Sequence, residues 1–112
     1  MTNYKQQDVI LVDFGFTQGE GSKKRPALII SSDSYHKGRQ EVIIAAITSN
    51  TTRVLFGDTK ITSWQGAGLL YPSLVTAIIR TIKASLILRK LGILSKADFQ
   101  EVHASIRESL NL

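Results

Sequence analysis

The residues of this chain best suited to chemistry are an arginine and a threonine at the ends of two apolar segments. Arg25 stands directly before Pro26 and the apolar run 27–30, and Thr48 directly follows the apolar run 42–47. Pro26 fixes its own φ and biases Arg25 toward an extended conformation, so the arginine opens a stiff strand. If the two strands pair antiparallel, the start of one lies beside the end of the other, and Arg25 and Thr48 share one rim.

A guanidinium and a hydroxyl at one rim match the oxygens of a phosphate group. Arginine carries a permanent charge in a fork that fits phosphate oxygens, and a threonine hydroxyl can donate to the same group. Such a pair could cut RNA without a metal, because both groups would stabilise the charge that develops when a ribose 2′-hydroxyl attacks phosphorus. The sequence offers no evident general acid or base. An arginine before a proline is more often a surface residue, so the spacing alone leaves a structural interpretation open.

The loop before Arg25 is rich in glycine and lysine. Three glycines within residues 15–21 allow backbone conformations that are closed to other residues. Lys23 and Lys24 place two more cations next to the arginine. We expect residues 16–24 to form a flap over the rim, an arrangement suited to meet a polyanion.

Other common catalytic sites are disfavoured. The only histidines, His36 and His103, lie far apart in the sequence and outside a metal-binding spacing. We interpret His103 as a residue on the flank of a helix, and His36 as a solvated loop residue that is a weak candidate for substrate contact. The glycine loop lacks the spacing of a P-loop or a dinucleotide fingerprint, and no serine occupies a G-x-S-x-G elbow. We expect no metal and no cofactor.

Length and composition predict one domain over residues 1–112, without a membrane span. No apolar run reaches about 18 residues, the N-terminus lacks the apolar segment of a secretory signal, and cysteine is absent. These features favour a cytoplasmic protein. The formal net charge is +5, and all of the excess lies before the acidic tail 95–112. A basic body favours an anionic partner, with nucleic acid as the leading candidate, although ordinary solubilising charge gives the same balance.

Hydrophobic patterning predicts a small, mostly antiparallel barrel followed by one helix. Ser95 and Asp98 resemble a capping box at the start of that helix, with Asp in place of Glu or Gln. Its apolar stripe comprises Phe99, Val102, Ile106 and Leu110. The expected strands are 9–14, 27–30, 42–47, 74–82 and 87–91, with short candidates at 54–55 and 69–70 and one possible helical turn within 32–40.

Several of these segments, in this order, resemble the PemK/MazF family of toxins from toxin–antitoxin pairs. They are DVILVDF at 8–14, KRPALIIS at 24–31, VIIAAITS at 42–49, RTI at 80–82 and LGIL at 91–94. The similarity runs from about residue 8 to residue 112. It implies a mainly β fold, a small SH3-like barrel with a C-terminal α-helix, and a homodimer.

The resemblance also implies an activity and its site. The family cleaves single-stranded mRNA as metal-independent, sequence-specific endoribonucleases, and leaves 2′,3′-cyclic phosphate and 5′-hydroxyl ends. Its catalytic arginine corresponds to Arg25 and its catalytic threonine to Thr48. A cognate antitoxin would be expected to lay an acidic, disordered segment across the same groove. The candidate RNA-binding residues are Gln18, Lys23, Lys24, Ser49, Asn50 and Arg80.

The chain departs from the family pattern around the R-T-I strand. Ala77, Ile78 and Lys83 stand where many members carry polar or acidic residues, so the substrate contacts or the dimer surface there can differ. Two alternatives stay open at this point. One is a protein-binding toxin that resembles the CcdB gyrase poisons, and the other is an RNA-binding module without catalysis. We also expect the apolar run 74–82 to serve a dimer face as well as the core.

Overall fold

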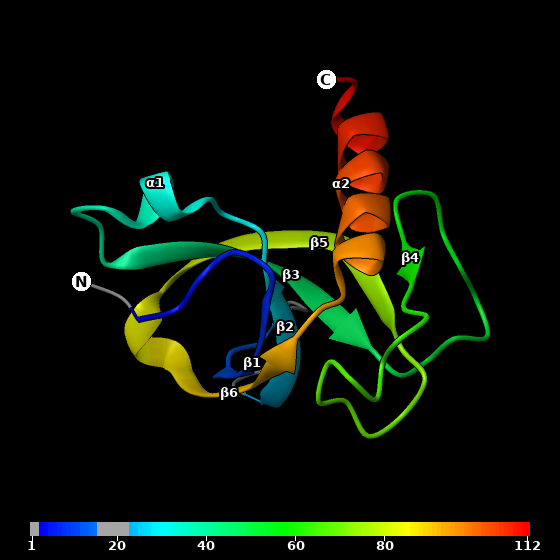
Figure 1. Cartoon of the computed structure of the whole chain (residues 1–112), viewed down its shortest axis with the longest axis horizontal. Coiled ribbons are helices and arrows are strands. Elements are labelled where there is room, and N and C mark those ends of the chain that lie inside the picture. The colour runs from blue at the N-terminus through cyan, green and yellow to red at the C-terminus, as the bar shows by residue number, and fades with distance from the viewer. Residues whose placement is uncertain (1–2, 16–22) are drawn as a thin grey trace.

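The computed structural model describes residues 3–15 and 23–112 of the chain, and Figure 1 shows their arrangement. The predicted flap, 16–24, therefore falls mostly outside the described residues, and so does Gln18. The elements in chain order are β1 (Asp8–Asp13), β2 (Lys24–Ile29), α1 (Asp33–His36), β3 (Glu41–Thr48), β4 (Thr59–Lys60), β5 (Leu74–Lys83), the 3-10 turn η1 (Ala84–Leu86), β6 (Ile87–Ile93) and α2 (Lys96–Leu110).

The strands form one antiparallel sheet in the order β4-β5-β3-β2-β1-β6. The sheet curls on itself, so that β5 and β6 wrap around the other strands (Figure 1). Within the described residues, the edge strands β4 and β6 are not hydrogen-bonded to each other, and the barrel-like sheet stays open. The predicted fold class, mainly β with a C-terminal helix, is confirmed.

Both faces of the central strands are buried, which explains why their sequences are continuously apolar. Val9 belongs to one hydrophobic cluster and Ile10 to a second, as expected for neighbours on opposite faces of a strand. The first cluster is covered by α2 through Val102 and by the segment 61–69. The second joins residues of β1, β2, β3, β5 and β6. One face of the central strands thus packs against α2 and the segment 61–69, whereas the residues of the other face pack against one another.

Five predicted strands and the helical turn are confirmed, but the two short strand candidates are wrong. Residues 54–55 lie in an exposed loop that is held by Asp58, whose carboxylate accepts from the Leu55 N–H at 2.9 Å. Leu69 is instead a buried anchor of an irregular segment. Short apolar runs can serve a loop as well as a strand, and between residues 54 and 70 only the short β4 forms.

The predicted start of α2 is confirmed, although only half of the capping box forms. Ser95 Oγ accepts from the Asp98 N–H at 3.1 Å. The buried Asp98 carboxylate instead accepts from Thr62 N–H at 3.1 Å and Ser63 N–H at 2.9 Å, and so ties the helix to the segment after β4. The predicted stripe ends one turn early, because Leu110 is 56% exposed.

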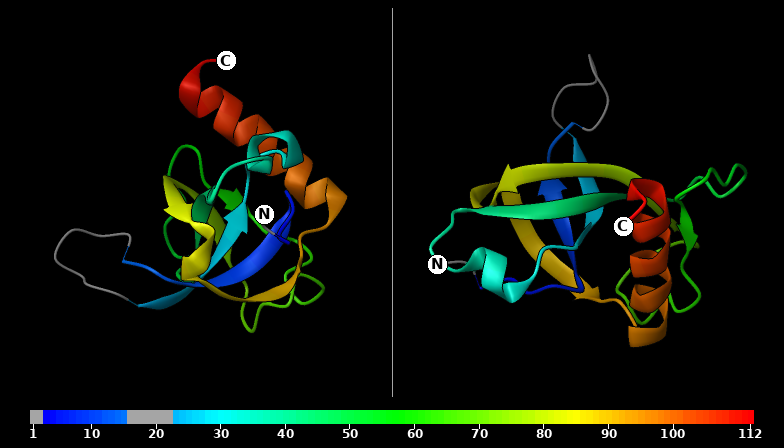
Figure 2. Two further views of the ribbon diagram at one scale, coloured as in Figure 1. Left: turned by 90° about the vertical axis from the view of Figure 1, so that its left-hand side faces the viewer. Right: turned by 90° about the horizontal axis from the view of Figure 1, so that it is seen from above.

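The two helices lie toward opposite ends of β3 (Figure 1). Figure 2 shows α2 alongside β4, and α1 at the far end of β3. In the part of the chain that the structure describes, neither helix is long and apolar enough to cross a membrane.

Candidate active site

A cavity of about 580 Å³ opens between the start of β2, the end of β3, β6 and the segment that follows β4. We call it the Arg25 cavity. Its described lining residues are Leu11, Arg25, Pro26, Ile47, Thr48, Ser49, Gly68, Leu69, Leu70, Tyr71, Ser73, Arg89 and Leu91.

Strand register brings Arg25 and Thr48 to the same end of the sheet. β2 and β3 pair antiparallel with Ala27 opposite Ala46, so two further residues along each strand bring Arg25 level with Thr48. On its other side, Arg25 pairs with Val12 of β1. Both side chains are half-buried and line the Arg25 cavity. A ligand in this cavity can therefore meet the guanidinium and the hydroxyl together.

The charges that line the cavity are positive. Arg25 contributes one guanidinium from β2. Arg89 of β6, which pairs with Leu11 of β1, contributes a second. Among the described lining residues there is neither a carboxylate nor an imidazole. Two guanidinium groups facing one cavity suit a phosphodiester, because each can bind two of its oxygens.

The Thr48 hydroxyl is held in place by the loop that it begins. Its Oγ1 accepts from the Asn50 N–H at 3.1 Å. Asn50 Oδ1 in turn accepts from the Thr52 N–H at 3.2 Å and from the Thr52 hydroxyl at 2.6 Å. Because the Thr48 oxygen acts as an acceptor within the loop, its hydrogen remains to be donated to a ligand.

Comparison with family models decides what kind of protein carries this cavity. Residues 5–110 match the model described as "PemK-like, MazF-like toxin of type II toxin-antitoxin system". The chain belongs to this family. A comparison with curated protein sequences finds no match.

Solved structures of MazF toxins share the fold of this PemK/MazF chain. MazF from Deinococcus radiodurans aligns with a TM-score of 0.80 at 15% identity, over 100% of both chains. Toxin MazF-mt6 from Mycobacterium tuberculosis aligns with a TM-score of 0.78 at 23% identity, over 94% of this chain and 97% of that one. An endoribonuclease from a mycobacterial species, solved with its cognate antitoxin, gives 0.76 at 17% identity, over 97% and 96%. At these identities the likeness concerns the fold.

The other RNA-binding candidates of this PemK/MazF chain lie in different places. Ser49 lines the Arg25 cavity. The described lining of this cavity does not include Lys23, Lys24, Asn50 or Arg80. Lys23 and Lys24 are exposed beside Arg25 where β2 begins. The side-chain carbonyl oxygen of Asn50 accepts from Thr52 within the loop.

Arg80 lies in the middle of β5, opposite Ile44 rather than Thr48. It is exposed, and its Nη1 donates to the carbonyl oxygen of Ile79 at 2.9 Å. Ile44 and Thr48 are four positions apart in β3, so Arg80 does not lie level with Thr48. Contacts of Arg80 with RNA stay a prediction, as do the roles of the other candidates.

The structure adds two residues that the sequence did not single out, Arg89 and Tyr71. Arg89 is one of two adjacent basic residues in β6, and nothing in its spacing marks it. Tyr71 lies between the short strand candidate 69–70 and Pro72, and nothing in this local sequence marks it as an exposed aromatic at a cavity mouth.

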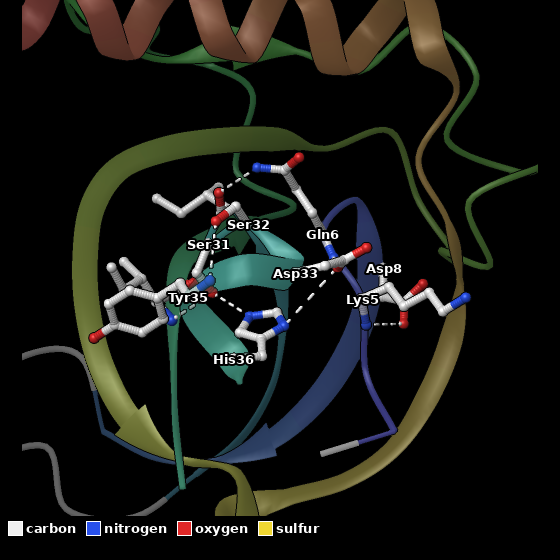
Figure 3. A network of polar contacts seen from close by, with 10 residues as sticks. Lys5, Gln6, Asp8, Ser31, Ser32, Asp33, Tyr35 and His36 are labelled. Carbon is white, nitrogen blue, oxygen red and sulfur yellow. Dashed lines mark hydrogen bonds and ion pairs between the residues drawn. The ribbon is translucent and has the colours of Figure 1, made fainter. Parts of the chain in front are cut away.

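The interpretation of His36 as a solvated residue is wrong. His36 is only 4% exposed, and its Nε2 lies 2.6 Å from the Ser31 hydroxyl (Figure 3). Ser31 Oγ also accepts from the Ile43 N–H at 3.0 Å, so the pair fastens α1 to β3. His36 borders a second cavity of about 530 Å³ between α1 and the N-terminal segment, separate from the Arg25 cavity. His36 therefore stabilises the packing of α1 on β3, and it lies outside the described lining of the Arg25 cavity.

Proposed function

We propose that this chain is the toxin of a type II toxin–antitoxin pair and acts as an endoribonuclease on single-stranded RNA. The observation that carries the proposal is the shared cavity of Arg25 and Thr48 in a member of the PemK/MazF family. Solved structures with the same fold are named as endoribonucleases, which supports the same activity here.

In the proposed reaction, the scissile phosphate of an mRNA binds in the Arg25 cavity. The ribose 2′-oxygen forms a bond to phosphorus and loses its proton, while the bond from phosphorus to the 5′-oxygen breaks and that oxygen gains a proton. The products are a 2′,3′-cyclic phosphate and a 5′-hydroxyl. Arg25 would stabilise the charge on the phosphoryl oxygens and Thr48 would donate to one of them. The two guanidiniums of the cavity supply positive charge without a metal ion.

We further propose the partners that this activity implies. A cognate antitoxin with an acidic segment would complement the net charge of +5, and structural relatives were solved with their antitoxins. We expect the toxin to work in the cytoplasm on mRNA, as a homodimer. The order of bases that it cuts depends on contacts between side chains and unpaired bases.

The decisive experiment uses purified protein, long single-stranded RNA and excess EDTA. We expect discrete cuts with cyclic phosphate ends. Arg25→Ala should lower the cleavage rate by about 100-fold to 1000-fold, as the loss of one donor to a developing oxyanion does in other enzymes. Arg107→Ala, an exposed arginine near the end of α2, is the matched control and should cleave normally.

Three results would overturn the proposal. RNA of varied sequence that stays intact would remove the ribonuclease activity. Growth arrest that persists unchanged in Arg25→Ala cells would point to a protein target instead, as in the CcdB alternative. Salt-sensitive RNA binding without products would leave only the RNA-binding module.

A further inference from the structure

We infer that Tyr71 and Arg89 form a nucleotide subsite beside Arg25 and Thr48, with the base stacked on Tyr71 and its phosphate on Arg89. The inference rests on the proposed function and names the residues that select the base next to the cut. It begins from an exposed aromatic side chain at the mouth of a basic cavity.

The first observation is the exposure of two large side chains at that mouth. Tyr71 is 63% exposed and its neighbour Leu70 is 80% exposed, yet both line the Arg25 cavity. Exposed apolar side chains that border a charged cavity often mark a binding site. Unstacked RNA bases stack on aromatic side chains, so Tyr71 has the chemistry of a base platform.

The second observation is that Tyr71 stands on a firmly anchored segment. On one side, Ala67 and Leu69 are buried, and the Leu69 N–H donates to the Trp64 carbonyl oxygen at 3.1 Å. On the other, Ser73 Oγ donates to the carbonyl oxygen of Tyr71 itself at 2.8 Å. The segment curls beside the end of β3 (Figure 1). A platform that is already ordered loses little entropy when a base binds.

The third observation is the contact between this segment and β6, the strand that carries Arg89. A Cβ built on Gly68 would lie 2.1 Å from the carbonyl oxygen of Leu91, and one built on Gly92 would lie 2.4 Å from that of Ala67. Only glycines let the two backbones approach so closely. This contact fixes Tyr71 relative to Arg89.

These observations together place three groups around one cavity, each suited to a different part of an RNA strand. Arg25 and Thr48 face the scissile phosphate, Arg89 offers a second cation for a neighbouring phosphate, and Tyr71 offers a ring for the base between them. Every base can stack on the Tyr71 ring to some degree. The shape of the cavity around Leu69 and Leu70 would then determine which bases fit there. The subsite therefore contributes to the cleavage motif.

The test of the platform combines cut-site mapping with a direct stacking signal. Wild-type protein, Tyr71→Ala and Tyr71→Phe are compared on one long RNA, together with Phe56→Ala as the control. Phe56 is an exposed aromatic at 77%, and it is not among the lining residues of the Arg25 cavity. We expect Tyr71→Ala to lose roughly 10-fold to 100-fold in kcat/KM and to lose base preference at one position beside the cut. Tyr71→Phe should keep both.

The stacking signal uses 2′-O-methyl oligonucleotides that carry 2-aminopurine and cannot be cut. Wild-type protein and Tyr71→Phe should quench the 2-aminopurine, and Tyr71→Ala should not. Arg89 is tested by salt titration of the same oligonucleotides. In Arg89→Ala, the slope of log affinity against log salt should be smaller in magnitude by about 0.7, whereas Arg107→Ala keeps the wild-type slope.

The outcomes separate this inference from the proposed function. If Tyr71→Ala cuts the same sites at the wild-type rate, the platform is overturned while the ribonuclease stands. Equal losses in Tyr71→Phe and Tyr71→Ala would assign the effect to the hydroxyl and overturn stacking. If wild-type protein cuts no RNA, the proposed function falls, and quenching that depends on Tyr71 would still support a nucleotide subsite.

Discussion

At the scale of single residues, the proposed chemistry depends on a small number of polar side chains that line the Arg25 cavity. Two guanidiniums and one well-placed threonine hydroxyl carry the polar character of its described lining, together with Ser49, Ser73 and Tyr71. In such a site electrostatic stabilisation of the transition state is the main source of catalysis. Each donor is then expected to contribute separately, and its removal should be visible in the rate.

The Thr48 hydroxyl can be removed with little change in shape. Thr48→Val should lower the cleavage rate by about 10-fold or more, because one donor to the phosphate is lost. Stability should change by less than about 1 kcal/mol, since water can take the place of the Thr48 oxygen as acceptor for the exposed Asn50 N–H. Thr48→Ser keeps the hydroxyl and should retain most activity. Single-turnover kinetics and thermal denaturation of both variants check this, and a fully active Thr48→Val would exclude a catalytic role.

His36 illustrates the opposite case, a residue of catalytic type in a structural position. Loss of its buried bond to Ser31 should cost His36→Ala about 2 kcal/mol or more of stability. The melting temperature should then fall by roughly 10 °C, as expected for a domain of about 100 residues. Cleavage measured well below that temperature should be unchanged. The control His103→Ala changes an exposed residue of α2 and should affect neither property. Lost cleavage in folded His36→Ala would connect α1 to the active site.

At the scale of elements, β6 and the segment 61–73 decide what the cavity looks like. The pairing of β6 with β1 has register shifts on both sides of the pairs that Arg89 and Lys90 make with Leu11 and Ile10. Such shifts re-aim the side chains of a strand. The close backbone contact at Gly68 and Gly92 holds the segment 61–73, which forms another wall of the Arg25 cavity, against β6. These irregular features build the site on an otherwise regular sheet.

Gly92→Ala tests that contact. The added Cβ would meet the Ala67 carbonyl at 2.4 Å, so the backbones must separate, at a cost of about 1–3 kcal/mol. Because the displaced wall carries Tyr71, cleavage should fall even at temperatures where the variant is folded. Gly66→Ala is the matched control, since its nearest heavy atom would be 3.7 Å away. Denaturation curves and cleavage rates of both proteins check the prediction, and a Gly92→Ala protein with wild-type stability would contradict the contact.

The difference between the regular strands and the irregular features of the site explains what the sequence could predict. The five main strands, the Ser95 cap and the shared end of Arg25 and Thr48 follow from local patterns and one assumption about pairing. Arg89 and Tyr71 depend on strand register and on an irregular segment, neither of which leaves a periodic signal. The burial of His36 arises from contacts between α1 and β3, which join segments that lie apart in the sequence. Local sequence patterns carry no information about such packing.

At the scale of the whole molecule, the surface carries apolar residues that the core does not use. Leu74, Val75 and Ile82 of β5 are buried, whereas Ile78 is 42% exposed. β4 pairs only with Leu74 and Val75, so the rest of this edge of β5 has no partner strand among the described residues. Natural proteins usually protect such an edge. A second copy of the chain would cover both the edge and Ile78.

The homodimer is therefore expected to use β5, and a charge at its centre should break it. Sedimentation at micromolar concentration should show wild-type protein as a dimer and Ile78→Asp as a monomer, because a carboxylate buried in an apolar interface without a partner is costly. Leu88→Asp on β6 is the matched control: its side chain is 46% exposed, close to that of Ile78, and this variant should remain dimeric. A monomeric wild-type protein would remove the dimer. Monomers of Leu88→Asp alone would move the interface to β6, where it would lie next to Arg89 and connect assembly directly to the proposed nucleotide subsite.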